Sequence, residues 1–429
     1  MNYKKLRGYI FPNVFAMVGV SLYILADTFF ISASAGANGL TALNLALPLY
    51  SAIFAVGAML GNGAATAFAL EKSVPGNDAD TYFSHSVMAN LLISIPFVLI
   101  GIFMPDKLLA LLGGDDVIVE TGYVYVRTFL SCTPFFLLNS TFTSFVRNDG
   151  APNVAMAATL ISCLFNIVFD YVLMFPCGLG MFGAALATGL SPAVSIAVTL
   201  VHFFSPKNTI RFRILLPNIR KIVRACRLGI GYFVSEISGG ISGFVFNRIL
   251  LGLVGNIAVA AYGIVANISV VGTAIFSGVA QGLQPMASEA QGTGDTQARK
   301  AFCRYSLKTG ILIAAAIVLL LCLFAREVVA IFNSEHNAQM ASLAVSNLRL
   351  YALGFLPASA NIILCGYFGA IGRDRLCSVI SISRGVVAIV LFAWLLSSLF
   401  GIVGVWIAYP VTELFTLIMA LALILRKGL

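Results

Sequence analysis

Twelve apolar runs, most of them about 20 residues or longer, follow one another along this chain with short polar breaks between them. A run of that length crosses the hydrocarbon core of a membrane as one helix. Because 59% of the 429 residues are hydrophobic and only 10% are charged, no soluble core could bury the apolar surface. The sequence therefore predicts an all-α polytopic membrane protein. We place its twelve transmembrane helices near residues 9–32, 40–70, 83–104, 119–147, 152–175, 181–204, 229–252, 257–283, 303–325, 341–371, 376–398 and 403–425.

Lysine and arginine gather on one side of the predicted membrane. Twenty of the 26 basic residues lie on the side that both chain ends share, and the loops of the other side hold only Lys107 and Arg326. By the positive-inside rule we expect both termini in the cytoplasm and the chain in the plasma (inner) membrane. Four arginines lie near span ends, where we expect them to extend toward the membrane surface: Arg127, Arg248, Arg349 and Arg384.

The sequence repeats itself at an offset of about 220 residues. GMFGAALAT at 180–188 resembles GIVGVWIAY at 401–409, and AGANGLTALNLAL at 35–47 resembles VGNIAVAAYGIVA at 254–266. Because six spans preserve orientation, the halves form two parallel six-helix repeats, an arrangement of secondary transporters with the substrate path between the halves. The domains that we expect are an N-terminal six-helix lobe at 1–204, a basic amphipathic cytoplasmic linker at 205–228 and a C-terminal six-helix lobe at 229–429.

Two acidic residues lie at similar depths inside predicted spans. Asp27 and Asp170 each precede the outer end of a span by about five residues, which places both roughly 8 Å below the outer surface. Asn166 lies one turn deeper on the face of Asp170, and Thr188 reaches a similar depth in the next span. Because a bare carboxylate in a membrane costs several kcal/mol, this pattern predicts a site for Na⁺ or a shared proton. The alternative is that the two acids are separate, hydrogen-bonded structural groups.

Three further residues of the spans are candidates for function. Glu236 lies about two turns from the cytoplasmic face and could attract a cationic substrate, and Glu413 lies near mid-membrane with no acidic partner in the sequence. For both, a satisfied helix contact is an equally good interpretation. Pro12, fifteen residues before Asp27, removes a helix hydrogen bond and permits bending. We hypothesise that cation capture at Asp27 changes this bend.

These residues carry a resemblance to a known family of membrane proteins. The chain resembles the MATE (multidrug and toxic compound extrusion) family of cation-coupled exporters over nearly its whole length. The residues of its motifs are most similar to those of the bacterial MepA-like branch. The motifs are Pro12 with AD at 26–27, GLTALNLALP at 39–48, FVRNDGAP at 145–152, NIVFDYVLMF at 166–175, GLGMFGAALAT at 178–188, QPMASEAQGTGD at 284–295 and FGAIGR at 368–373.

The resemblance implies a fold, a function and a set of site residues. It implies that Asp27, Asn166, Asp170 and Thr188 form the family's N-lobe cation site, with H⁺ or Na⁺ as the coupling ion. It also implies antiport by alternating access, with export of organic, often cationic and lipophilic compounds, as in multidrug efflux and antibiotic resistance. The chain departs from some branches because span ten carries no acid, which leaves Glu236 without that partner.

Other functions fit the sequence less well. A flippase for a lipid-linked or other amphiphilic substrate would need basic residues in the central cavity, and Arg384 is the residue that could serve it. An intramembrane enzyme would need a nucleophile–base pair or an HExxH motif, and a channel would not need two lobes. We expect no enzyme activity, no cofactor and no resident metal beyond Na⁺. The expected partners are small-molecule substrates and membrane lipids, with no nucleic acid, and the chain is expected to be a monomer.

Overall fold

The structure is a computed structural model that describes residues 3–72, 79, 81–214, 217–332 and 338–426, and every secondary-structure element of this part is a helix. Lys427 and residues 215–216 of the predicted linker lie outside the described residues. The helices are α1 (Tyr3–Lys72), α2 (Thr81–Phe103), α3 (Pro105–Leu111), α4 (Asp116–Ser131), α5 (Thr133–Asn148), α6 (Pro152–Met174), α7 (Gly180–Phe203), α8 (Ile219–Leu253), α9 (Asn256–Gly292), α10 (Thr296–Leu323), α11 (Ala325–Phe332), α12 (Ala338–Ala352), α13 (Phe355–Ala370), α14 (Asp374–Ile382), the π-helix η1 (Ser383–Val387) and α15 (Ala388–Arg426).

The helices account for all twelve predicted spans. Within the described residues, nine helices are long and apolar enough to cross a membrane, and two bent pairs, α4 with α5 and α12 with α13, bring the number to eleven. The last of the nine, Asp374–Arg426, contains a non-helical residue at Gly401 that divides it into two. The prediction of an all-α polytopic membrane fold is therefore confirmed.

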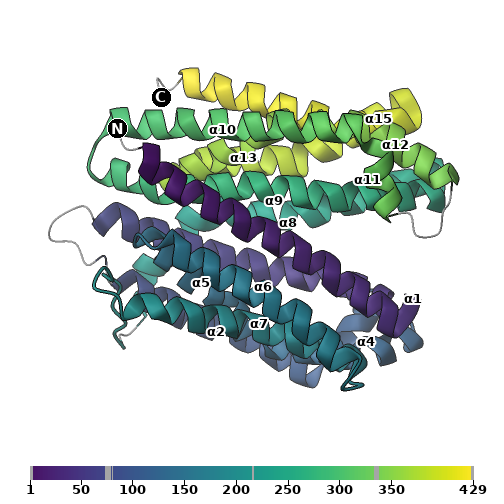
Figure 1. Cartoon of the computed structure of the whole chain (residues 1–429), viewed down its shortest axis with the longest axis horizontal. Helices are drawn as coiled ribbons and strands as arrows, with labels where there is room; N and C mark the ends of the chain where they lie inside the picture. Colours follow the sequence, from purple (N-terminus) through teal and green to yellow (C-terminus); the bar gives the residue numbers. More distant parts are fainter. Residues whose placement is uncertain (1–2, 73–78, 80, 215–216, 333–337, 427–429) are drawn as a thin grey trace.

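The helices form two groups that face each other across the molecule (Figure 1). The first group holds the second half of α1 (Asn38–Lys72) with α2 to α7, and the second group holds α8 to α15. The first half of α1 (Lys4–Gly36) runs diagonally between them. It begins beside the second group, where Lys5 pairs with Glu289 of α9, and it passes into the first group, where it packs on α6. This segment therefore touches both groups along its length.

The backbone repeats in the same way as the sequence. Gly36 and Gly255, 219 residues apart, both adopt positive φ angles of 61° and 93° between the first two spans of each half. Gly180 and Gly401, 221 residues apart, do the same with φ angles of 48° and 57° between the last two spans. The bent pairs also correspond, with angles of 44° between α4 and α5 and 49° between α12 and α13. The two halves are therefore built on one backbone plan.

Small residues hold the diagonal segment of α1 close to α9. A Cβ atom at Gly282 would lie 2.6 Å from the Cα atom of Ile10, and one at Gly278 would lie 2.6 Å from the Cα atom of Val14. Such distances are too short for real side chains, so glycine is required at both positions for the backbones to approach this closely. The contact fixes the beginning of α1 against the second helix group.

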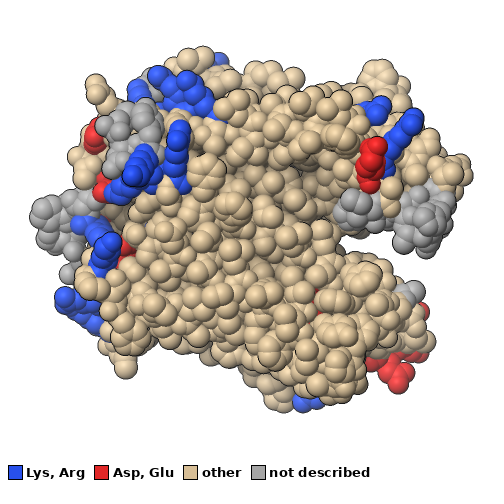
Figure 2. Space-filling view, viewed as in Figure 1, with Lys and Arg blue, Asp and Glu red and all other residues tan. Residues whose placement is uncertain are grey.

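The two ends of the molecule differ in charge and in shape. At the end where α1 begins and α15 ends, which we call the basic end, Lys and Arg side chains gather on the surface (Figure 2). At the opposite end the surface is hollowed between the two helix groups (Figure 2). The helix groups therefore meet at the basic end and separate toward the other.

We predict that Gly282→Ala destabilises the folded protein by about 1–3 kcal/mol, because the new methyl group forces α1 away from α9. Thermal unfolding of the purified protein in detergent measures the effect. Gly263→Ala is the matched control, since it lies on the same helix and a Cβ atom there would meet nothing within 4 Å. Equal unfolding temperatures for the two variants would contradict the close approach of the helices.

Candidate functional site

The predicted N-terminal cluster is formed by α1, α6 and α7. Asn166 of α6 and Thr188 of α7 are both buried, and the Asn166 amide donates a hydrogen bond of 3.2 Å to the Thr188 hydroxyl. Asp170 lies one turn further along α6 on the same face and is also buried. The buried carboxyl of Asp27 on α1 is close enough to Asp170 to interact with it electrostatically. The structure thus brings the four predicted residues into one region.

Several oxygen atoms of this cluster have no hydrogen-bond partner within the described residues. They are both carboxylate oxygens of Asp170, Oδ1 of Asp27 and Oδ1 of Asn166, and all four atoms are buried. Buried acceptors without a donor are costly, and a cation or a proton is what such a set of oxygens would stabilise. Among the described residues, no three or more His, Cys, Asp or Glu side chains are placed so that they could hold a metal ion together. Amide and hydroxyl oxygens would therefore have to complete the coordination of a cation at this cluster.

Helix geometry places the cluster in the half of the membrane away from the basic end. Asp170 precedes the end of α6 at Met174 by four residues, about 6 Å along the axis. Asp27 precedes the break at Gly36 by nine residues, about 14 Å, which is deeper along its helix than the sequence predicts. The helix continues past the predicted end of the apolar run at residue 32, because hydropathy marks the edge of the apolar run and the glycine marks the edge of the helix.

Pro12 lies in a helical stretch of α1 near the basic end. The only non-helical backbone angles within α1 belong to Gly36, so the helix is unbroken at Pro12. The proline is buried, and its neighbours Asn13 and Val14 contact α9 at Gly278. The bend that the sequence suggests at this position stays a prediction.

The two remaining acidic candidates lie in different environments. Glu236 is exposed on α8, and no hydrogen bond or ion pair joins it to another described residue. Glu413 is buried on α15 and accepts hydrogen bonds of 3.1 and 2.6 Å at Oε1 from Nε and Nη2 of Arg384. Asn361 of α13 donates a further bond of 2.7 Å to Oε2 of Glu413.

The expectation that Arg384 extends toward the membrane surface is wrong. The side chain is 15% exposed and its guanidinium is held by Glu413 inside the second helix group. The two oxygens of the buried Glu413 carboxylate accept hydrogen bonds from the guanidinium. The side chain therefore finds acceptors inside the protein and does not need to reach the membrane surface. The sequence signal for this pair was an Arg and a Glu in the last two spans, with Glu413 near mid-membrane and without an acidic partner.

Polar side chains link the helix groups at the basic end. The buried Arg147 of α5 donates from Nη1 to Gln281 of α9 and, over 3.1 Å, to Asn13 of α1. Gln284 of α9 donates a bond of 2.7 Å to Thr66 of α1. These bonds close the basic end of the molecule. Arg147 and Gln284 belong to the motifs FVRNDGAP and QPMASEAQGTGD, whereas the sequence gives no sign of the roles of Asn13, Thr66 and Gln281.

Another buried carboxylate, that of Asp149, lies at the basic end and outside the spans. Asp149, after α5, accepts hydrogen bonds from Lys72 over 2.5 Å, from the Thr209 backbone over 2.8 Å and from the His202 ring. Burial by itself would raise the pKa of Asp149, but the bonds from Lys72, Thr209 and His202 together hold this pKa below its usual value. The network ties the chain after α7 to the ends of α1 and α5.

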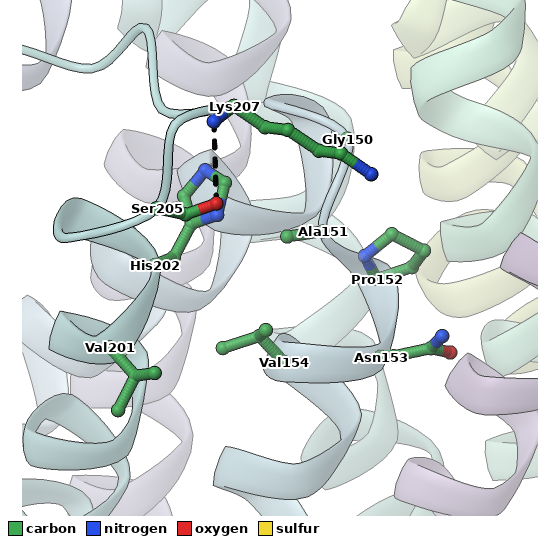
Figure 3. Close-up of a pocket in the computed structure, with 9 residues that line it drawn as sticks. All are labelled: Gly150, Ala151, Pro152, Asn153, Val154, Val201, His202, Ser205 and Lys207. Carbon is green, nitrogen blue, oxygen red and sulfur yellow. Dashed lines mark hydrogen bonds between the residues drawn. The ribbon is translucent and has the colours of Figure 1, made fainter.

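A cavity of about 330 Å³ lies beside this network (Figure 3). Its lining includes the first residues of α6, from Pro152 to Val154, with His202 of α7 and Lys207 after it. Asp170 is eighteen residues further along α6, about 27 Å away along the axis. The cavity is therefore separate from the acidic cluster.

Comparison with known proteins gives the family. The family model described as MatE matches residues 12–172 and 233–395, one match in each half of the chain. The chain belongs to the MatE family. It is a multi-pass membrane transporter, not an enzyme.

Relatives of known name and structure agree with this membership. The multidrug export protein MepA of Staphylococcus saprophyticus is 26% identical over 93% of this chain and 89% of its own length. The protein of the same name from Staphylococcus aureus is 25% identical over 94% of this chain and 89% of its own length. A solved MOP superfamily transporter from Pyrococcus furiosus superposes with a TM-score of 0.92 at 24% identity, over 99% of this chain and 95% of that one, and so shares the fold.

We predict that Asp149→Asn lowers the free energy of unfolding at pH 7 by about 1–3 kcal/mol, because it removes the negative charge that Lys72 and His202 contact and replaces one of the two acceptor oxygens by an NH₂ donor. The folded-state pKa of Asp149 is depressed, so its stabilisation is present above about pH 4 and disappears as the pH falls through the folded value. Unfolding temperatures of both proteins from pH 7 to pH 3 should therefore converge at the acidic end. A difference that is constant over this range would contradict the ionised carboxylate.

Proposed function

We propose that this MatE-family transporter is an antiporter that exports organic, often cationic and lipophilic compounds in exchange for inward movement of H⁺ or Na⁺. The observation that carries the proposal is the buried cluster of Asp27, Asp170, Asn166 and Thr188, whose carboxylate oxygens have no donor among the described residues. Carboxylates without hydrogen-bond donors are costly to bury in a membrane, and a bound cation removes that cost. Such a site therefore binds a cation more readily than one whose carboxylate oxygens all have donors. The names of the MepA relatives support multidrug compounds as the exported class.

The energy of one cation is sufficient for useful export. One positive charge that moves inward through about 100 mV supplies about 2.3 kcal/mol, which corresponds to a substrate gradient of roughly 40- to 50-fold. A chemical gradient of the same ion adds to this. The oxygen set would accept Na⁺ as well as a proton, so both ions belong to the proposal.

We infer that the two helix groups act as lobes that alternate in access. The units are residues 1–204 and 229–429, joined by residues 205–228, and the basic end faces the cytoplasm in agreement with the positive-inside rule. The hollow between the groups at the opposite end would then be open to the outside (Figure 2), while the bonds of Arg147 and Gln284 close the cytoplasmic end. The α8 helix already begins at Ile219, so the joining segment includes its first turns.

The diagonal half of α1 gives cation binding a physical connection to access. Near one end it carries Asp27 beside Asp170 of the first lobe, and at the other end it packs on Gly278 and Gly282 of the second lobe. Two ionised carboxylates repel each other, and a bound cation or proton removes that repulsion. Occupancy of the cluster therefore changes the force between α1 and α6, and the helix can transmit it to the contact with α9.

Glu236 is the candidate for contact with a cationic substrate, because its carboxylate is exposed on α8 without a charged partner in the described part of the chain.

A flippase for a lipid-linked substrate is the second candidate function. Phosphate recognition would depend on Arg384, but Arg384 forms an ion pair with Glu413 inside the second helix group. Its positive charge is therefore already neutralised within the protein. This pairing favours the antiporter.

We predict that Asp27→Asn and Asp170→Asn each reduce gradient-driven ethidium efflux from proteoliposomes by at least tenfold, the factor that about 1.4 kcal/mol represents. Efflux is measured first with an imposed proton gradient and then with a Na⁺ gradient, and one of them should drive it. Asp106→Asn, an exposed acid on α3, is the matched control and should transport like the wild type. Undiminished efflux in both site variants would remove the cluster from the mechanism.

We predict that Pro12→Ala impairs the coupling of ion to substrate several-fold, because the variant restores the backbone donor that proline lacks and stiffens α1 where it packs on α9. The ratio of ions moved to ethidium moved, measured in the same proteoliposomes, reports coupling separately from the amount of active protein. An unchanged ratio and rate would show that α1 does not need to bend at this residue.

A further inference from the structure

The second lobe contains a polar cluster of its own, formed by Arg384, Glu413 and Asn361. Nε and Nη2 of Arg384 both donate to the Glu413 carboxylate, and the Asn361 amide donates 2.7 Å to its Oε2 atom and 2.8 Å to the backbone oxygen of Glu413. Glu413 and Asn361 are buried. In contrast to the acidic cluster of the first lobe, both carboxylate oxygens of Glu413 have donors.

The internal repeat places the two clusters at related positions. At the offset of 221 residues that relates Gly180 to Gly401, Thr188 corresponds to Tyr409, which lies one turn before Glu413 on the same face of α15. At the same offset Arg384 corresponds to Cys163, one turn before Asn166 in α6. The clusters therefore occupy matching faces of matching spans, and the second lies one turn nearer the basic end.

Two of the residues that would bind a cation in the first lobe, Asn166 and Asp170, have no polar counterpart in the second. The offset of 221 carries Asn166 to Val387 and Asp170 to Leu391, and neither can offer an oxygen from its side chain. The net charge of the second cluster is also less favourable for binding a cation. The first cluster contains two carboxylates and no basic residue, whereas the second contains one carboxylate and one guanidinium.

Local backbone structure holds Arg384 in place. It lies in the π-helix η1, a wider turn of a kind that often occurs at functional sites. The next residue, Gly385, packs directly on α8, where a Cβ atom would lie 1.9 Å from Oγ of Ser238. The guanidinium is thus held by the backbone of its own helix and by Glu413 from the next one.

We propose that Arg384 is the built-in cation of the second lobe, which occupies the Glu413 site permanently and thereby confines ion coupling to the acidic cluster of the first lobe. The inference rests on the proposed antiport. Arg384 acts through Glu413: it holds the carboxylate that would otherwise bind a second coupling ion. Two buried oxygen atoms beside the pair, Oδ1 of Asn361 and the hydroxyl of Tyr409, have no partner within the described residues. Together with the Glu413 carboxylate they could hold Na⁺ or a proton once the guanidinium is removed.

The test measures the number of cations that the purified protein binds, as ²²Na⁺ and as protons released on alkalisation. The background is Asp27→Asn with Asp170→Asn, which removes the first cluster. Adding Arg384→Gln should create one new cation equivalent per chain, and adding Glu413→Gln to that protein should abolish it. Arg384→Lys is the control, because it retains the positive charge and should create none.

A structural role alone predicts a different result. If Arg384 only braces α15 against its neighbours, Arg384→Gln lowers the unfolding temperature and gains no cation, and this outcome would overturn the proposal. Should Arg384→Gln not fold, Glu413→Gln alone decides, since the proposal requires it to retain the wild-type number of cations and loss of one equivalent would contradict it. Failure of the antiport proposal is recognised separately, because the wild type would then lose no cation on removal of Asp27 and Asp170.

Discussion

The electrostatic relation between Asp27 and Asp170 is the constraint on which the rest of the structure depends. Two carboxylates that lie close together in a membrane interior repel each other and lack the water that would screen them. They belong to α1 and α6, and α1 is the segment that passes from one helix group to the other. In the proposed mechanism the charge state of this pair acts on the helix that contacts both helix groups. Glycine contacts at the basic end fix that helix against the second group.

The two lobes use one backbone plan with opposite electrostatic solutions. In the first lobe, buried carboxylate oxygens of Asp27 and Asp170 lack donors among the described residues, and in the proposed mechanism a bound cation or proton supplies what they lack. In the second lobe Arg384 and Asn361 satisfy Glu413 from within the chain. Breaking a buried ion pair costs several kcal/mol, which makes the second cluster a fixed element of the structure. A repeated fold can in this way place a variable site in one half and a constant one in the other.

Hydropathy and helical periodicity were sufficient to predict the spans and the relation between Asn166 and Asp170, since four residues make about one turn on one face. The similar depth of Asn166 and Thr188 in neighbouring spans was predicted as well, and the structure adds a hydrogen bond between them. The pair of Arg384 and Glu413 was missed, because an arginine near a span end is expected to reach the surface and sequence gives no sign of the π-helix that redirects it. The pattern of a single sequence gives the depth of a residue in its span and the helix face on which it lies. A bond between two long side chains also depends on how each helix is rotated about its axis in the bundle.

The exchange of a cation for substrate is tested most directly by running the reaction from the substrate side. Proteoliposomes with an imposed ethidium gradient and no ion gradient are monitored for movement of H⁺ with an enclosed pH indicator and for movement of ²²Na⁺. We expect one of the two ions to move against the direction of ethidium, and to stop moving when Asp27 and Asp170 are both replaced by Asn. Ethidium that equilibrates without movement of either ion would contradict coupled antiport.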